Sequence, residues 1–518
     1  MDVRSTSRLI LLSLVLAGLL LAGCGGSGSS SSVVPETTTS VTGTVTAGAV
    51  DGGSLSVLDL TGNVVAGPVQ TSQGSYSVDI PDDRLGEDLV MECTGGTFID
   101  EATGEPTSAG TMSAYLAMNT LTLGSEIHLT PGSTVVRGMI RAGLSQTEAE
   151  AAFAGAFGFT PDLAIEPNLQ GDGTDEQNLA GLRTGAFSRL TADLGYAPAD
   201  QFDLLAAISE DLADGDLDGE GATIMELTGD TANHFAGCLI EQGKGMGMAA
   251  DQLGSLPFAT VAETESYQIE YLAGMMGAMQ GKTVFSLKVT DLVTAAPVTG
   301  ATLNLKATMT MATMSHGTPV DSVTEMGDGV YQCTVYYLMA SMMNGVSAGY
   351  WSLQATVNDE AATFYPNVTM AMGDTTRATL KDANDKIAGM MGQPASVRSY
   401  YLFKNSLSGE TGNHILKLFL ATRESLMNHP ALFTGQVLTD ENGQSWTVTT
   451  MNVQLSTDGG NNWTEMVDDG NGSWVGAAIS DLVEGESATI LVRLLVNGVE
   501  KTGNGEAGGD PASFTMTP

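Results

Sequence analysis

The chain is 518 residues long, which is enough for several domains. Asp and Glu outnumber Lys and Arg by 60 to 20, so the formal net charge is -40 although only 15% of the residues are charged. A surface this acidic repels phosphate backbones, and the composition therefore excludes nucleic acid as a partner.

The N-terminus has the pattern of an export signal. The apolar run Leu9–Leu20 follows Arg4 and Arg8 and is too short to cross a bilayer comfortably. The run ends in Leu21-Ala22-Gly23-Cys24, with small residues before the cysteine. This order of positive, apolar and small residues is typical of a cleaved signal rather than of a membrane helix.

The motif that ends at Cys24 resembles the lipobox of bacterial lipoproteins. The resemblance implies that residues 1–23 are a signal peptide and that the Cys24 thiol carries a lipid, which anchors the mature chain to a membrane of the cell envelope. Gly25, in place of Asp, further implies sorting to the outer membrane, facing the periplasm or the cell surface. The alternative is an ordinary secretory signal that is followed by a cysteine by chance.

Residues 24–40 are predicted to be a flexible linker, because Gly25 to Ser32 contain only Gly and Ser. If Cys24 carries lipid, three cysteines remain, at Cys93, Cys238 and Cys333. An odd number leaves at least one thiol unpaired, and their wide separation gives no zinc-like spacing. We therefore expect no disulfide framework.

Residues 41–130 are predicted to be a β-domain. Hydrophobic residues alternate in Val41–Val45, Leu55–Leu58 and Tyr76–Ile80, with Gly and Asn turns between these segments. The order of strands and turns resembles the carboxypeptidase-regulatory-like or transthyretin-like sandwich. That resemblance implies a spacer module without catalytic groups.

Residues 131–260 are predicted to form an α-helical domain. Ser145 and Glu148 make a capping box before an Ala-rich run, and helical spacing recurs in Leu179–Leu194 and Ala199–Leu212. The segment resembles a helical region of bacterial lipoproteins of unknown function, which implies a fold class but no chemistry. Residues 261–282 are predicted to be a connector.

An acidic loop directly after the last of these helices is a candidate calcium site. Asp214, Asp216 and Asp218 are followed by Gly219, which is the first half of an EF-hand-type loop. The twelfth position of that pattern is Met225 instead of an acidic residue. The alternative is a solvated turn at the end of a helix in an acidic chain.

Residues 283–373 are predicted to be an immunoglobulin-like sandwich, since four segments alternate in hydrophobicity between Gly-rich turns. Within this region, Pro297-Val298-Thr299-Gly300-Ala301 leads into a Met-rich turn, then His316-Gly317, and then Tyr350-Trp351 in a later strand. This order resembles YtkA-like and FixH-like domains. Some of these domains are linked to copper handling or oxidase assembly, and many have no assigned function.

The Met-rich turn is a candidate copper site. Met309, Met311, Met314 and His316 supply thioethers and an imidazole, the soft donors that suit copper(I), and Met339, Met342 and Met343 follow after the next strand. The alternative is core packing: Met309 and Met311 continue the inward-facing row of Leu303 and Leu305, and methionine fills gaps in cores that are poor in aromatic residues.

Residues 374–394 are predicted to be a linker, and residues 395–518 a C-terminal β-domain. The segment Ser456-Thr457-Asp458-Gly459-Gly460, followed by Trp463, resembles the Asp-box of sialidases and β-propellers. The Asp-box is a structural brace of a hairpin, and a single copy does not indicate a glycosidase.

The predicted fold class is a multidomain, mainly β protein, in which one α-helical domain is inserted between immunoglobulin-like and transthyretin-like sandwiches. The sequence contains no G-x-S-x-G elbow and no H-E-x-x-H helix, and Met427 with His429 adds only an isolated pair of soft donors. We therefore expect a non-enzymatic scaffold or binding protein of the cell envelope, with an envelope protein or a polysaccharide as its partner. The alternative is a copper-handling or redox-accessory lipoprotein.

Overall fold

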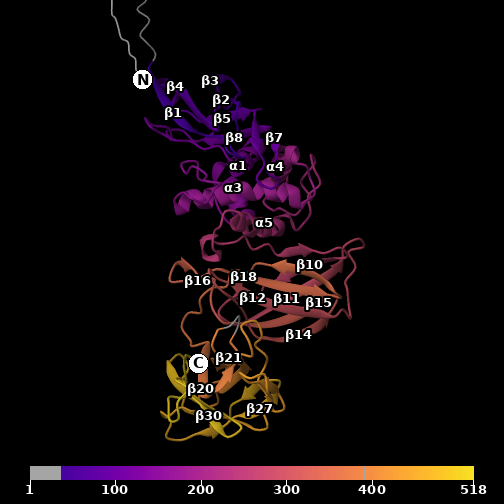
Figure 1. The fold of residues 1–518 in the computed structure, drawn as a ribbon, viewed down its shortest axis with the longest axis vertical. Coiled ribbons are helices and arrows are strands. Elements are labelled where there is room, and N and C mark those ends of the chain that lie inside the picture. The colour runs from indigo at the N-terminus through magenta and orange to yellow at the C-terminus, as the bar shows by residue number, and fades with distance from the viewer. Residues whose placement is uncertain (1–36, 390–392) are drawn as a thin grey trace, which may run out of the picture. The chain divides into compact units, whose positions relative to one another are not determined.

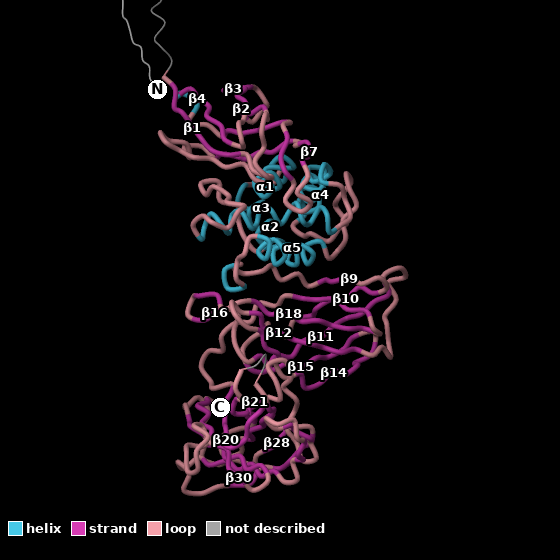
Figure 2. Tube along the Cα trace, in the orientation of Figure 1, coloured by secondary structure: helices cyan, strands magenta, loops and turns pink. Residues whose placement is uncertain are grey.

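The computed structural model describes residues 37–389 and 393–518. Strands predominate, and the α-helices are gathered in one segment of the chain with strands before and after it (Figures 1 and 2). The predicted fold class, a mainly β multidomain protein with one inserted helical domain, is confirmed. The predicted signal peptide, the lipidation site Cys24 and most of the predicted linker lie outside the described residues.

The first domain is a small β-domain. Its main sheet has the order β3-β2-β5-β8, while β1 pairs with β4 and β6 pairs with β7. The predicted alternation holds in β4, where Tyr76, Val78 and Ile80 are buried and the residues between them are exposed. The strands are β1 (Thr38–Thr44), β2 (Ser54–Asp59), β3 (Val64–Gln70), β4 (Ser75–Pro81), β5 (Leu89–Thr94), β6 (Thr97–Ile99), β7 (Pro106–Ser108) and β8 (Thr111–Leu116).

The second domain is helical. The predicted capping box is present: the Ser145 side chain accepts from the Glu148 backbone, and the Glu148 side chain accepts from the Ser145 backbone. Buried Phe side chains from α2, α3 and α5 meet in the core, where the Phe157 and Phe235 ring centroids lie 4.8 Å apart. The helices are α1 (Pro131–Ala142), α2 (Gln146–Phe157), α3 (Asp175–Asp193), α4 (Gln201–Asp211) and α5 (Thr231–Gly245).

The third domain is a sandwich of a five-stranded sheet, β14-β15-β11-β10-β9, and a four-stranded sheet, β13-β12-β18-β19. Alternate residues from both sheets fill one core. The strands are β9 (Val261–Glu263), β10 (Tyr267–Leu272), β11 (Gly281–Asp291), β12 (Leu303–Thr310), β13 (Ser315–Gly317), β14 (Val320–Gly327), β15 (Val330–Tyr337), β18 (Tyr350–Val357) and β19 (Glu360–Phe364), with the short hairpin β16 (Met342–Met343) and β17 (Val346–Ser347).

The connector predicted at 261–282 is wrong, because β9 and β10 belong to the five-stranded sheet. Ile269 and Tyr271 are buried at alternate positions of β10, so this strand does have the period of a sheet. The strand has only six residues, and the Gly- and Met-rich segment after it obscures the pattern.

The fourth domain packs the sheet β20-β21-β22-β28-β27 against the sheet β26-β25-β29-β30, in which β31 also pairs with β29. In β29, Ile490, Val492 and Leu494 are buried at alternate positions, as expected of a strand in the predicted C-terminal β-domain. The strands are β20 (Arg377–Ile387), β21 (Ser396–Ser408), β22 (Ile415–Thr422), β23 (Val437–Thr439), β24 (Ser445–Thr447), β25 (Met451–Ser456), β26 (Thr464–Glu465), β27 (Val467–Gly470), β28 (Ser473–Val475), β29 (Ala488–Val496), β30 (Val499–Lys501) and β31 (Ala512–Met516).

The linker predicted at 374–394 is also wrong, because it contains β20, which pairs with β21. Charged residues that are paired with other charged groups conceal this strand in the sequence. Asp382 is 8% exposed and binds the buried Lys501 ammonium at 2.7 Å. Asp385 binds Arg398, whose side chain is fully buried, at 3.0 Å. Buried charges need such partners, so a hydrophobic period cannot reveal a strand of this kind.

Candidate functional site

The predicted Met-rich turn is the hairpin between β12 and β13. The Met311 backbone N–H donates to the Met314 carbonyl at 2.9 Å and closes the turn. In the register of the sheet, Met309 lies opposite His316 on one side and opposite Trp351 on the other. Residues that are directly opposite in an antiparallel pair share a face. Met309, His316 and Trp351 therefore lie on the same, inner face of the sheet.

The structure places the predicted copper ligands in three different environments. Met309 is fully buried in the core, which favours the packing alternative for this residue. Met311 is half-buried against the same core, and Met314 is 43% exposed.

His316 contacts one of the methionines that follow the next strand. Its Nε2 atom lies 3.4 Å from the Met339 Sδ atom, in the loop that follows β15. Its Nδ1 atom lies 2.8 Å from the Gly317 carbonyl oxygen. A carbonyl only accepts, so Nδ1 carries the hydrogen, and in the neutral ring Nε2 presents a lone pair towards the sulfur. Burial lowers the pKa of His316, which favours the neutral ring.

A second buried histidine comes from the fourth domain. His429 is 6% exposed, and its Nδ1 atom has no hydrogen-bond partner among the described residues. Burial, then repulsion by His316 and Arg423, lowers the pKa of His429 to about 3.

The backbone before His429 lies directly against β13. The Gly317 N–H donates to the Leu426 carbonyl at 2.7 Å. A Cβ atom on Gly317 would lie 2.5 Å from the Met427 carbonyl oxygen, so this close approach requires glycine. The sequence did not predict that the loop of His429 packs on the strand of His316, because the two residues belong to different domains and no sequence spacing connects them.

The predicted calcium loop is held by a residue outside the motif. Asp211 is 1% exposed, and its carboxylate accepts from the Gly219 backbone at 3.0 Å and from the Gly221 backbone at 2.7 Å. Asp214, Asp216 and Asp218 are exposed. In the described part of the chain, no group of three or more His, Cys, Asp or Glu side chains is arranged to hold a metal ion. The calcium prediction therefore gains no support from this loop.

His234 is paired with two carboxylates, and the cysteines of the described chain are buried. His234 is bound by Asp193 at 2.5 Å and by Asp230 at 3.2 Å, and these two hydrogen bonds raise the pKa of His234 to about 10. Cys93, Cys238 and Cys333 are free and buried. Burial raises the pKa of the Cys333 thiol to about 12, which makes it a poor nucleophile.

The Asp-box has the geometry of a hairpin brace. The Asp458 carboxylate accepts from the Asn462 backbone at 2.9 Å, the Asn461 backbone at 3.0 Å and the Ser456 hydroxyl at 2.8 Å. These bonds, with one from the Asn462 side chain, lower the pKa of Asp458 to about 2. The Trp463 ring is covered by the Arg493 guanidinium, 4.1 Å from its centroid. The motif is structural here, as its resemblance implies.

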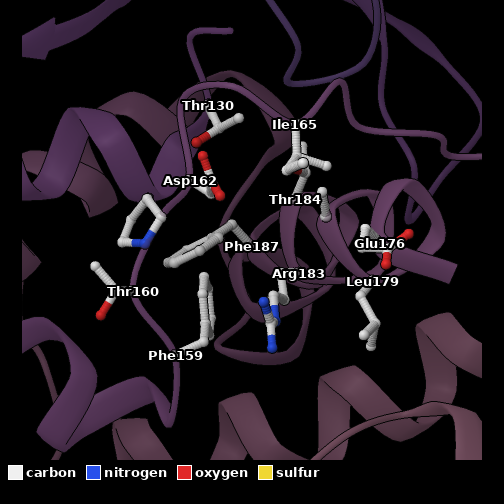
Figure 3. A pocket seen from close by; sticks show the side chains of 13 residues that line it. Thr130, Phe159, Thr160, Asp162, Ile165, Glu176, Leu179, Arg183, Thr184 and Phe187 are labelled. Carbon is white, nitrogen blue, oxygen red and sulfur yellow. The ribbon is translucent and has the colours of Figure 1, made fainter. Parts of the chain in front are cut away.

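The helical domain contains a cavity of about 180 Å³ (Figure 3). Apolar side chains form much of its wall, and the Arg183 guanidinium lies 4.5 Å from the centroid of the Phe159 ring. Burial lowers the pKa of Arg183. Asp162 and Glu176 line the same cavity. An anionic ligand would therefore be attracted by Arg183 and repelled by the two carboxylates. The lining therefore does not select one class of ligand.

No known protein family and no curated protein matches this chain. Among solved structures, the chain is similar to FdeC, an Escherichia coli adhesin, at 15% identity and a TM-score of 0.16, over 49% of this chain and 66% of that chain. It is also similar to the titin domains Z1Z2 in complex with telethonin, at 10% identity and a TM-score of 0.12, over 46% of this chain and 91% of that chain. Scores this low carry no argument about what the chain does. None of the helices described here is long and apolar enough to cross a membrane.

Proposed function

We propose that the chain is a lipid-anchored, non-enzymatic, modular protein of the cell envelope that acts as a scaffold or a binding protein. The observation that carries the proposal is that neighbouring domains are joined by packed and hydrogen-bonded side chains. A scaffold has to keep its domains in a fixed relation, and large or specific junctions restrict the domain motions that are otherwise expected.

Each junction has its own contacts. The Ser188 hydroxyl of α3 donates to Asp100 of the first domain at 2.5 Å. The Asn233 side chain of α5 donates to the Thr363 carbonyl of the third domain at 2.9 Å. Between the third and fourth domains, the Tyr336 and Phe419 rings stack with centroids 4.4 Å apart and an angle of 5° between their planes.

The tether and the partner complete the proposal. Lipid on Cys24 holds the chain on a membrane, and the partner is an envelope protein or a polysaccharide. Two features support this assignment: the lipobox-like end of the export signal and the acidic composition, which disfavours nucleic acid.

Detergent-phase partitioning of the chain, expressed in bacteria with its signal, tests the tether. We expect the wild-type chain to enter the detergent phase and Cys24→Ser to remain in the aqueous phase. Ser27→Ala, a change in the same Gly/Ser segment, is the matched control and should partition like the wild type. A wild-type chain that stays in the aqueous phase contradicts the anchor.

A second candidate function is copper handling or a redox-accessory role through the third domain. One specific observation favours it: the lone pair of the His316 Nε2 atom faces the Met339 sulfur at 3.4 Å in a largely buried setting. Imidazole and thioether are donors of the type that binds copper(I).

A further inference from the structure

We propose that the Nε2 atom of His316, the Sδ atom of Met339 and the imidazole of His429 form a binding site for one soft monovalent cation, copper(I). This inference deepens the second candidate function and is independent of the scaffold proposal. Of the four residues predicted in the Met-rich turn, this ligand set keeps only His316. It takes Met339 from the loop after β15 and His429 from the next domain.

The contact between His316 and Met339 brings two electron-pair donors together. The Nδ1 hydrogen is used by the Gly317 carbonyl, which leaves Nε2 of the neutral ring without a hydrogen. A thioether sulfur has no hydrogen to donate either. The two atoms nevertheless lie 3.4 Å apart. A cation between them would satisfy both lone pairs at once.

The spacing of the two atoms also suits a shared metal ion. Metal–nitrogen bonds of about 2.0 Å and metal–sulfur bonds of about 2.3 Å, at a tetrahedral angle, separate the two donors by about 3.5 Å. The observed separation is 3.4 Å. A soft ion therefore fits with little movement of either side chain.

His429 supplies the third donor. Its ring is buried and has an Nδ1 atom without a partner among the described residues. A buried polar atom without a partner is uncommon and calls for an explanation. The close packing of the Leu426–Met427 backbone on Gly317 brings this loop to the strand that carries His316.

The surrounding charges favour the ion of lowest charge. The Arg377 guanidinium donates to the Leu338 carbonyl at 2.7 Å, next to Met339, and Arg423 begins the loop that carries His429. All three donors are neutral, so they do not offset the charge of the bound ion. Repulsion by the two guanidiniums therefore penalises a divalent ion more than a monovalent one.

Neighbouring groups fix the donors in place. The Trp351 indole N–H donates to the Met339 carbonyl at 3.0 Å, and the Trp351 ring meets the His316 ring edge-on, with centroids 5.6 Å apart. The bond from Nδ1 to a backbone carbonyl is the support that metal-binding histidines commonly have. The site is thus held by groups that do not themselves bind the ion.

The test is a competition titration of copper(I) against bicinchoninate, under reducing and anaerobic conditions, with the purified mature chain. We expect the wild-type chain to take copper(I) from the chelator. Met339→Leu keeps the apolar volume and removes the sulfur, and His429→Gln removes the imidazole; each should weaken copper(I) binding by about tenfold or more.

Met309→Leu is the matched control, because Met309 lies on the same inner face of the sheet but is packed in the core. It should leave copper(I) affinity unchanged. Far-UV circular dichroism confirms that each variant is folded. The proposal is overturned if the wild-type chain takes up no copper(I), if folded Met339→Leu binds like the wild type, or if Met309→Leu weakens binding as much as Met339→Leu does. None of these results affects the partitioning test of the scaffold proposal.

Discussion

Phe419→Ala should break the junction between the third and fourth domains. Phe419 lies in β22, where Leu418 and Leu420 face the core of the fourth domain and Phe419 faces Tyr336 and Phe403 instead. Truncation of a buried Phe to Ala costs about 3–5 kcal/mol. Because Phe419 faces the junction, we expect this loss to uncouple the two domains, so that calorimetry of the mature chain shows the third and fourth domains melting apart.

A double-mutant cycle isolates the stacked pair. Combining Phe419→Ala with Tyr336→Leu should reveal a coupling of about 0.5–1.5 kcal/mol, the usual contribution of an aromatic pair beyond the area it buries. Tyr336→Phe is the control: the Tyr336 hydroxyl is buried without a partner among the described residues, so its removal should cost almost nothing. If the two truncations are additive within about 0.3 kcal/mol, the stacked pair does not join the domains.

Three further predictions concern charged groups. Because folding raises the pKa of His234 to about 10, the contribution of His234 to stability should be full below pH 6.5 and disappear as the pH rises towards 10. His234→Gln should remove this pH dependence from the melting temperature. A variant whose melting temperature depends on pH as that of the wild type does would argue against this role of His234. Because folding lowers the pKa of Asp458 to about 2, the contribution of Asp458 to stability should be present above pH 3.8 and be lost as the pH falls to 2. Asp458→Asn should therefore reduce the fall of the melting temperature at acid pH. A fall as steep as that of the wild type would refute this role. Asp211→Ala should lower the free energy of unfolding in urea by about 2–4 kcal/mol, since two backbone donors lose their acceptor. Asp214→Ala, a change at an exposed residue, is the control and should lower it by less than about 0.5 kcal/mol. Equal losses would mean that Asp211 does not hold the loop.

Local patterns predicted the parts of the fold that depend on local physics. The capping box at Ser145 marks the start of α2, and the alternation of Tyr76, Val78 and Ile80 marks β4, because solvent on one face and core on the other select residues with the period of the element.

Features that depend on distant partners were missed. β20 carries Asp382 at a buried position, and only Lys501 makes that burial tolerable. The same reason limits the prediction of the candidate site. The sequence shows Met339 and His429 as further soft donors, but it does not show that the Met339 sulfur contacts the His316 Nε2 atom or that the loop of His429 packs on the same strand.

Intact-mass spectrometry of the chain extracted from bacterial membranes tests the central claim most directly. The account predicts a mature chain that begins at Cys24 and carries a covalent lipid on that residue. A chain that begins elsewhere, or one with the unmodified mass of residues 24–518, would contradict the lipid-anchored scaffold.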